Sequence, residues 1–198
     1  MKTVLLTGPI GSGKSAVSAL LRERGIPVYD SDARTKRLYD RRPALVRRLE
    51  QVLGLSLRTP EGKLDRARLA ARIFADDTAR ESLEAIVYPA VLQDFERWRG
   101  KQQEVPFVVL ESAVALAKPL FDNVWDVAVL VTAPEALRLQ RVMARDDADE
   151  SAVRARMAAQ QIPWDRAQVV LVNDSTPEAL SQAVEHTFFD KNSYLCKL

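Results

Sequence analysis

Eight residues near the start of the chain have the types and spacing of a phosphate-binding loop. Residues 8–15 read Gly-Pro-Ile-Gly-Ser-Gly-Lys-Ser, which fits G-x-x-x-x-G-K-[ST] at every fixed position. Glycines let a backbone turn its amides inward, and these amides with the start of a following helix form an anion site. Lys14 adds a mobile positive charge for the β- and γ-phosphates, and the Ser15 hydroxyl is a ligand for Mg²⁺. We predict a nucleoside triphosphate site formed by Gly8, Pro9, Ile10, Gly11, Ser12, Gly13, Lys14, Ser15 and the following Ala16.

A loop of this composition could instead be a turn that only connects a strand to a helix. The Lys-Ser pair and the apolar run in front of the loop, Thr3–Thr7, argue against that interpretation. Residues 8–15 are called the phosphate loop below. The motif indicates the nucleotide but not the reaction.

Acidic side chains follow two further apolar runs. Asp30-Ser31-Asp32 comes directly after Ile26–Tyr29, where a carboxylate could orient an attacking hydroxyl and accept its proton. Asp is also a preferred residue at a helix start, so one acid could cap a helix while the other faces a substrate. Glu111 ends the run Pro106–Leu110 and could hold Mg²⁺ through water, or could satisfy a nearby helix start. We leave both alternatives open.

Arginines recur in a helical pattern later in the chain. Arg141 and Arg145 are four residues apart, so they share one face of a helix, and Arg138 precedes them. On a mobile flap they would neutralise charge as a phosphoryl group moves. The alternative is a surface helix whose arginines pair with the acids of residues 146–150.

The elements that must position these residues alternate between strands and helices. Continuous apolar runs suit strands that are buried on both faces of a parallel sheet. Strand patterns cover Thr3–Thr7, Ile26–Tyr29, Pro106–Leu110, Val127–Thr132 and Val169–Val172. Helical patterns cover Lys14–Arg24, Leu137–Arg145, Ala152–Gln161 and Pro177–Phe188. The order predicts an α/β fold with right-handed crossovers.

The segment from residue 34 to residue 100 has helical periodicity and almost no strand pattern, and it is too long for an ordinary crossover. We therefore predict a nucleotide-binding core of residues 1–33 plus 101–198, with a lid at about 137–160, and a helical insert at 34–100. The insert begins with seven basic residues and one acid between residues 34 and 48. This basic run is either a solvated helix face or a surface for a multiply anionic ligand.

Composition excludes several classes of protein. The chain has 198 residues, of which 47% are hydrophobic and 28% charged, so a disordered or collagen-like chain is excluded. A single cysteine, Cys196, and a single histidine, His186, exclude an internal disulfide and zinc sites of the Cys/His type. The single cysteine fits a reducing compartment, and no apolar stretch is long enough for a membrane span, so we expect a cytoplasmic protein.

Together these segments resemble the dephospho-CoA kinase family, from about residue 3 to about residue 185. The resemblance is carried by the ordered segments 6–15, 25–32, 64–76, 141–147 and 172–174. It implies a three-layer α/β P-loop kinase fold with a parallel five-stranded sheet, a helical substrate-binding insert and a lid. It also implies transfer of the γ-phosphate of ATP, with Mg²⁺, to the ribose 3′-hydroxyl of dephospho-CoA. That reaction gives CoA and ADP and is the last step of coenzyme A biosynthesis.

The resemblance further assigns roles to single residues. Asp32 matches the base or orienter of the hydroxyl, Lys14 keeps its phosphate role, and Arg141 and Arg145 match the lid arginines. Asn173 matches the end of the last strand, near the adenine side. The chain departs from the family pattern at Tyr88-Pro89, where many members have His-Pro, and at residues 113–117, which end in Ala117 where many members have Glu.

Other functions are compatible with the same phosphate loop. One is a P-loop kinase for another small hydroxyl or nucleotide acceptor. Another is a P-loop regulatory or RNA-binding module that uses the basic run, although the net charge is only +2 and no RNA-module motif is present. A third is an inactive scaffold, against which the intact Lys14-Ser15 argues. We expect ATP and dephospho-CoA as partners, neither nucleic acid nor membrane, and a monomer or weak homo-oligomer.

Overall fold

The computed structural model describes residues 1–193 and 195. Cys196 lies outside the described residues. The chain divides into two compact units. The core unit is Met1–Tyr29 together with the chain from Gln102 onward, and the insert unit is Asp30–Lys101.

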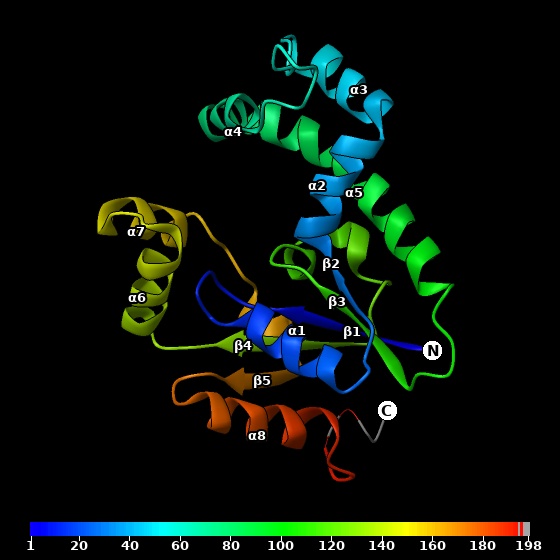
Figure 1. Ribbon diagram of the computed structural model, residues 1–198, viewed down its shortest axis with the longest axis vertical. Coiled ribbons are helices and arrows are strands. Elements are labelled where there is room, and N and C mark those ends of the chain that lie inside the picture. The colour runs from blue at the N-terminus through cyan, green and yellow to red at the C-terminus, as the bar shows by residue number, and fades with distance from the viewer. Residues whose placement is uncertain (194, 196–198) are drawn as a thin grey trace. The chain divides into compact units, whose positions relative to one another are not determined.

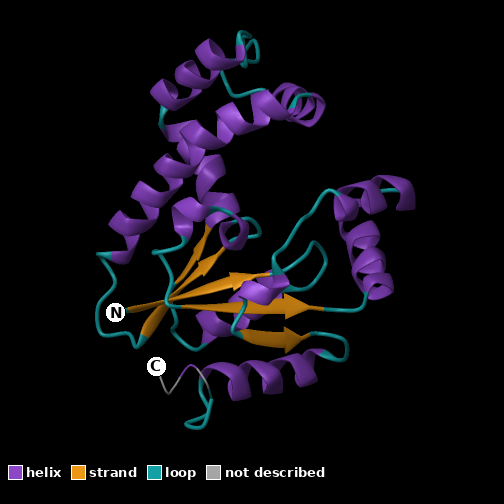
Figure 2. Cartoon of the chain, turned by 180° about the vertical axis from the view of Figure 1, so that it is seen from behind, coloured by secondary structure: helices purple, strands orange, loops and turns teal. Residues whose placement is uncertain are grey.

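Five strands form one sheet in the order β2-β3-β1-β4-β5 (Figure 1, Figure 2). The strands are β1 (Lys2–Thr7), β2 (Val28–Asp30), β3 (Phe107–Glu111), β4 (Val127–Thr132) and β5 (Val169–Val172). The pairs β1–β3, β1–β4 and β4–β5 are parallel, with Leu5 opposite both Leu110 and Ala128. The predicted parallel five-stranded α/β fold is confirmed. Because both faces of the inner strands are covered, β1 and β4 are buried at every position except Lys2 and Thr132, rather than alternating between buried and exposed.

Two helices pack together on one face of this sheet. They are α1 (Lys14–Glu23) and α8 (Pro177–Phe188). Their apolar sides share one buried cluster with alternate residues of β1, which include Val4 and Leu6. Thr176 caps α8 by accepting a hydrogen bond from the Ala179 amide. This cluster fixes the start of α1, and therefore the end of the phosphate loop, against β1.

The remaining helices of the core unit follow β4. Helix α6 (Glu135–Asp146) packs on α7 (Glu150–Ala158) through Leu139, Val142 and Val153. The sequence predicted a helix through Gln161, but α7 ends at Ala158, so the prediction that Gln160 lies in a helix was wrong. Ile162 precedes Pro163, which disfavours a helical conformation at that point. Short 3₁₀ turns complete the unit at Ala115–Ala117 (η1), Pro119–Phe121 (η2) and Trp164–Arg166 (η3).

The insert unit is built from four helices. They are α2 (Ser31–Arg41), α3 (Pro43–Leu53), α4 (Arg66–Ala75) and α5 (Asp77–Arg99). Helix α5 packs against the other three, and it buries a stripe that includes Leu83, Val87, Val91 and Phe95. A turn at residues 59–62 and a bridge between Arg58 and Leu64 join α3 to α4.

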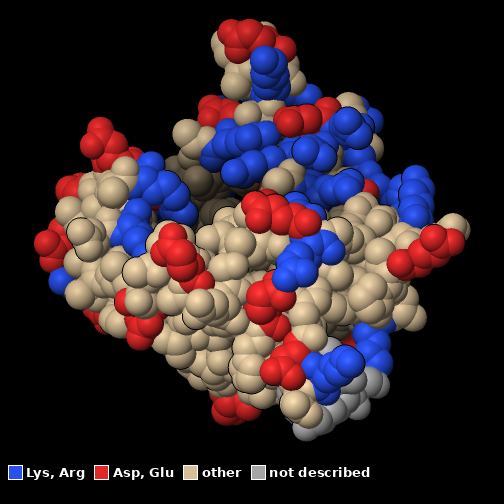
Figure 3. Space-filling model, turned by 60° about the horizontal axis from the view of Figure 1, so that its bottom comes forward, with Lys and Arg blue, Asp and Glu red and all other residues tan. Residues whose placement is uncertain are grey.

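Charged side chains are spread over both units. Figure 3 shows one face on which groups of Lys and Arg side chains alternate with Asp and Glu side chains. Most of the basic run is exposed on α2 and α3, and Arg34 forms an ion pair with Asp94 of α5 at 3.8 Å. Among the described residues, none of the helices combines the length and the apolar character that a membrane crossing requires.

Candidate nucleotide and phosphate site

The phosphate loop joins the end of β1 to the start of α1, as its motif predicts. Its three glycines have positive φ angles of 148° at Gly8, 78° at Gly11 and 98° at Gly13. A Cβ atom at Gly8 would lie 2.1 Å from the backbone oxygen of Val131 in β4, and one at Gly13 would lie 2.1 Å from Nδ2 of Asn173. Glycine is therefore required for both conformation and space.

Lys14 lies over the loop that precedes it. Its Nζ atom donates hydrogen bonds to the carbonyl oxygens of Gly8 at 2.7 Å and Pro9 at 3.2 Å. The ammonium group thus lies beside the loop that its motif assigns to phosphates. The amides that begin α1 lie at the same end of the helix, which favours a negative charge there.

Glu111 lies at the end of β3, directly beside the first turns of α1. Its carboxylate accepts hydrogen bonds from the Ser18 hydroxyl at 2.7 Å and the Ser15 hydroxyl at 3.2 Å. Glu111 is 8% exposed and Ser18 is fully buried, whereas Ser15 is exposed. A hydroxyl and a carboxylate oxygen side by side are hard ligands of the kind that Mg²⁺ binds, usually with phosphate oxygens completing its shell. The residues therefore fit the metal that the motif implies.

Arg141 of α6 lies against the end of β5. Its guanidinium donates to the backbone oxygen of Asn173 at 3.0 Å and to Oδ1 of Asn173 at 3.4 Å. The other end of the Asn173 amide, Nδ2, donates to the backbone oxygen of Ser12 at 2.9 Å. Three predicted site residues from distant parts of the sequence are therefore joined by hydrogen bonds.

Two further side chains hold the loop at Ile10. The Ile10 amide donates to Oε1 of Gln160 at 2.6 Å, and the Ile10 carbonyl accepts from Arg138 at 3.4 Å. Sequence reasoning missed the contact of Gln160, because 150 residues separate it from Ile10 and no motif connects them. Arg138 was a candidate for pairing with surface acids, but it donates to backbone carbonyls, at Ile10 and Ala133.

Arg145, the second predicted lid arginine, binds an acidic side chain. It forms a two-pronged ion pair with the neighbouring Asp146, at 2.7 and 3.0 Å, and Arg156 of α7 binds the same carboxylate at 2.8 Å. Hydrogen bonds from Arg145 and then Arg156 hold the pKa of the Asp146 carboxyl well below its usual value. Of the two predicted lid arginines, Arg141 contacts another predicted site residue, Asn173, whereas Arg145 pairs with Asp146.

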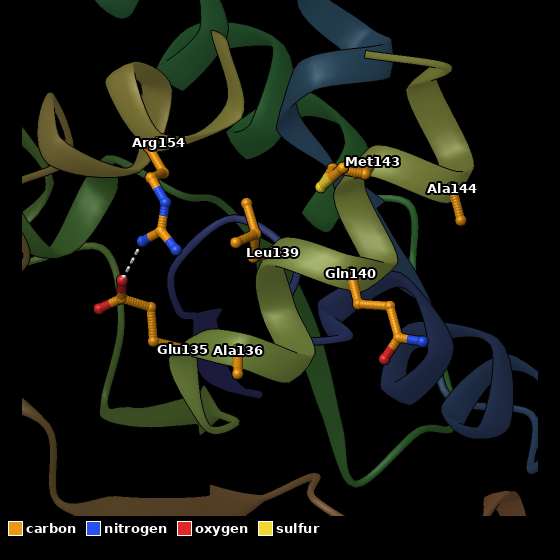
Figure 4. Close-up of a pocket in the computed structure, with 7 residues that line it drawn as sticks. All are labelled: Glu135, Ala136, Leu139, Gln140, Met143, Ala144 and Arg154. Carbon is orange, nitrogen blue, oxygen red and sulfur yellow. Dashed lines mark hydrogen bonds and ion pairs between the residues drawn. The ribbon is translucent and has the colours of Figure 1, made fainter. Parts of the chain in front are cut away.

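A shallow pocket of about 640 Å³ lies between α6 and α7 (Figure 4). Leu139 and Met143 are among its apolar lining residues, and Arg154 pairs with Glu135 at 3.2 Å. None of the predicted site residues lines it. We assign it no part in nucleotide binding.

Asp32 belongs to the insert unit. The sequence left two roles for the acids of the Asp-Ser-Asp segment, a helix cap and a contact with substrate, and the structure shows which acid is the cap. Asp30 is the N-cap of α2, since its carboxylate accepts from the Ala33 amide at 2.9 Å. Asp32 lies in the first turn of α2 and is exposed.

Tyr88 also belongs to the insert unit, and its hydroxyl donates a hydrogen bond to Glu84 at 3.1 Å. Burial, and then the carboxylates of Glu84 and Asp32, raise the pKa of the Tyr88 hydroxyl, so Tyr88 stays protonated.

Comparison with known proteins agrees with this geometry. The family model for dephospho-CoA kinase matches residues 2–178. A dephospho-CoA kinase of Porphyromonas gingivalis is 41% identical over 161 residues, which are 81% of this chain and 78% of that protein. A crystal structure of a Thermus thermophilus protein superposes with a TM-score of 0.80 at 35% identity, covering 93% of this chain and 94% of the other.

A dephospho-CoA kinase from Campylobacter jejuni shares the fold at 22% identity, with a TM-score of 0.57 over 92% of this chain and 93% of that one. The family match covers both the phosphate loop and the whole insert unit. The chain belongs to the dephospho-CoA kinase family.

Proposed function

We propose that the chain transfers the γ-phosphoryl group of ATP to the ribose 3′-hydroxyl of dephospho-CoA, giving CoA and ADP, the last step of coenzyme A biosynthesis. The observation that carries the proposal is a family match over residues 2–178 that includes an intact phosphate loop with Lys14 and Ser15. An inactive scaffold would not need this pair. The cytoplasmic location and a monomeric or weakly oligomeric state stay predictions.

The core unit binds ATP through the phosphate loop. Phosphoryl transfer depends on positioning and charge neutralisation more than on covalent chemistry. Lys14 exchanges the carbonyl oxygens of Gly8 and Pro9 for phosphate oxygens, which is a short movement for a flexible side chain. Ser15 would hold Mg²⁺, with Glu111 behind its hydroxyl, and the metal supplies positive charge to the phosphates when bound.

Asp32 is the proposed base or orienter for the acceptor hydroxyl. Its exposure in the first turn of α2 supports this role, and Asp30, not Asp32, is the N-cap of that helix. The insert, residues 34–100, is proposed to bind dephospho-CoA. The exposed basic run on α2 and α3 supports this, because it supplies charge for the phosphates of an anionic acceptor.

Arg141 and Arg145 are the proposed lid arginines. Each donates to oxygen atoms of the protein, Arg141 to Asn173 and Arg145 to Asp146, so each must exchange those partners to reach a phosphate. Closure of this segment would exclude water, which otherwise accepts the phosphoryl group.

An assay of ADP release tests the function. We expect turnover with dephospho-CoA and Mg²⁺, and little turnover when the metal is chelated or when shikimate, gluconate or a nucleoside monophosphate replaces the acceptor. Higher turnover with any of those acceptors would contradict the proposal and favour a kinase for another small hydroxyl or nucleotide.

A substitution tests the role of Asp32. We expect Asp32→Asn to lower turnover by orders of magnitude while ATP binding stays nearly intact, because the base is lost and the phosphate loop is not changed. Asp40→Asn is the matched control, since Asp40 is an exposed acid on the same helix that pairs with Arg66. Unchanged turnover in Asp32→Asn would refute the assignment.

A further inference from the structure

Asn173 follows β5, and its side chain contacts the phosphate loop. We propose that Asn173 is a positioning residue that fixes the loop in its phosphate-binding shape, rather than a residue that reads the adenine base. The inference rests on the proposed use of this loop for ATP. It goes beyond that function because it assigns the buried amide a task in shaping the loop.

The contact between Asn173 and the loop is buried. Asn173 is 6% exposed, and its backbone amide donates to the Thr132 carbonyl at 2.7 Å, which anchors it to the end of β4. From this position its Nδ2 atom donates to the Ser12 carbonyl at 2.9 Å. A buried hydrogen bond of this kind is costly to leave unmade, so the Ser12 carbonyl is held toward Asn173.

Holding this carbonyl also orients the next amide. The peptide bond between Ser12 and Gly13 is planar and trans, so its N–H points away from the direction of its C=O. With the Ser12 oxygen on the Asn173 side, the N–H of Gly13 faces the opposite side. Gly13 can take this conformation, with φ of 98°, and its missing Cβ leaves the space that Nδ2 occupies. Asn173 and Gly13 therefore fit one another.

Arg141 fixes which way the Asn173 amide points. A guanidinium can only donate hydrogen bonds, so the oxygen Oδ1 must face Arg141 and the nitrogen Nδ2 must face the Ser12 carbonyl. Both ends of the amide are then engaged within the protein. While Arg141 keeps this contact, a base would have to compete with Ser12 or with Arg141 for the amide, and after Arg141 moves to a phosphate Nδ2 still donates to the Ser12 carbonyl.

Ligands without a base distinguish the two roles. The probes are ATP, GTP and inorganic tripolyphosphate, with each dissociation constant measured by calorimetry for the full chain. We expect Asn173→Ala to weaken all three by a similar factor of about ten, as the loss of one buried hydrogen bond implies. Asn123→Ala is the matched control, an exposed asparagine before β4, and should change none of them.

Asn173→Asp removes the donor at nearly the same volume and keeps an acceptor for Arg141. Its carboxylate cannot donate to the Ser12 carbonyl and adds a negative charge beside the loop, so we expect at least the same loss for all three ligands. This variant also keeps the test valid if Asn173→Ala does not fold. In a turnover assay of either variant, the KM for ATP should rise, whereas kcat, measured at saturating ATP, should change much less.

Several results would overturn the proposal. Weaker binding of ATP with unchanged binding of tripolyphosphate, or a changed ratio of ATP to GTP affinity, would show that Asn173 reads the base. Failure of the unsubstituted chain to bind tripolyphosphate would show that no preformed phosphate site exists. Because the binding measurements include no acceptor, their outcome stands apart from the test of dephospho-CoA as substrate.

Discussion

Gly8 provides a sharp test of why the phosphate loop contains glycine. A Cβ at this position would lie 2.1 Å from the Val131 backbone oxygen, and the φ angle of 148° is one that other residues rarely adopt. Val131 is inside β4 and pairs with Leu171, so its carbonyl cannot move alone. The backbone would have to shift by roughly 1 Å to restore an ordinary contact. Gly8→Ala therefore combines a strained dihedral angle with a clash.

The size of the effect follows from these two contributions. A residue in a sparsely populated backbone region costs about 1–3 kcal/mol, and overpacking costs about 1–3 kcal/mol more. Their sum, about 2–6 kcal/mol, corresponds to a fall of roughly 5–20 °C in Tm for a chain of this size. Gly25→Ala is the matched control, because Gly25 has a φ of 76° but nothing within 4 Å of its added Cβ. It carries only the backbone contribution of about 1–3 kcal/mol, so it should lose about 2–12 °C and less than Gly8→Ala.

Thermal unfolding followed by circular dichroism, with and without ATP, measures both variants. ATP should raise the Tm of the control as it raises that of the unsubstituted chain, because its phosphate loop is unaltered. Gly8→Ala should lose this ligand-induced shift as well as intrinsic stability. Equal losses of Tm in the two variants would refute the steric reasoning, since they would show that the dihedral angle alone sets the cost.

Three further substitutions test other side chains, two in the core unit and one in the insert unit. Ser18→Ala removes a buried donor from Glu111, so we expect a loss of about 1–2 kcal/mol in urea denaturation, and an unchanged urea midpoint would contradict it. Asp146→Asn releases Arg145, so ATP should bind more tightly in calorimetry, and an unchanged Kd would show that Arg145 is not a phosphate ligand. Burial raises the pKa of Tyr39 from 10.0 to about 12, so the unfolded state loses its proton first and stability should fall between about pH 10 and 12. Urea midpoints at about pH 9 and 11 check this contribution. The fall in stability between these pH values should be smaller in Tyr39→Phe, and an identical fall would exclude the contribution of Tyr39.

The fold was predictable because its signals are local. Each buried parallel strand is one uninterrupted apolar run, so Thr3–Thr7 and Val127–Thr132 could be assigned without knowing what lies beside them. The phosphate loop is equally local, because eight adjacent residues supply the turn, the amides, the lysine and the hydroxyl.

The contacts that hold the site were not predictable to the same degree. Gln160 reaches Ile10 across 150 residues, and Asn173 reaches Ser12 across 161. Neither residue type signals such a contact in the sequence. The order of strands in the sheet brings them to the loop, and strand order is a property of tertiary structure.

The same distinction explains the open choice at the Asp-Ser-Asp segment. A helix start has one N-cap position, so an acid there and an acid two residues later cannot both cap it. The sequence could show that two carboxylates compete for two roles, but only the backbone decides which is the cap. Asp30 accepts from the Ala33 amide, and Asp32 is exposed within the first turn of α2.

The hydrogen bonds around the phosphate loop also limit where variation can be tolerated. Asn173 and Arg138 hold carbonyl oxygens of the loop, and Gln160 holds one of its amides. All three come from segments that follow β4, while Lys14 holds the loop from within. A side chain that contacts a backbone group constrains the loop's shape without constraining the loop's own side chains. It follows that Ile10, which is held through its backbone groups, should accept substitution more readily than Gln160 or Asn173, which is the reverse of what distance from the motif alone suggests.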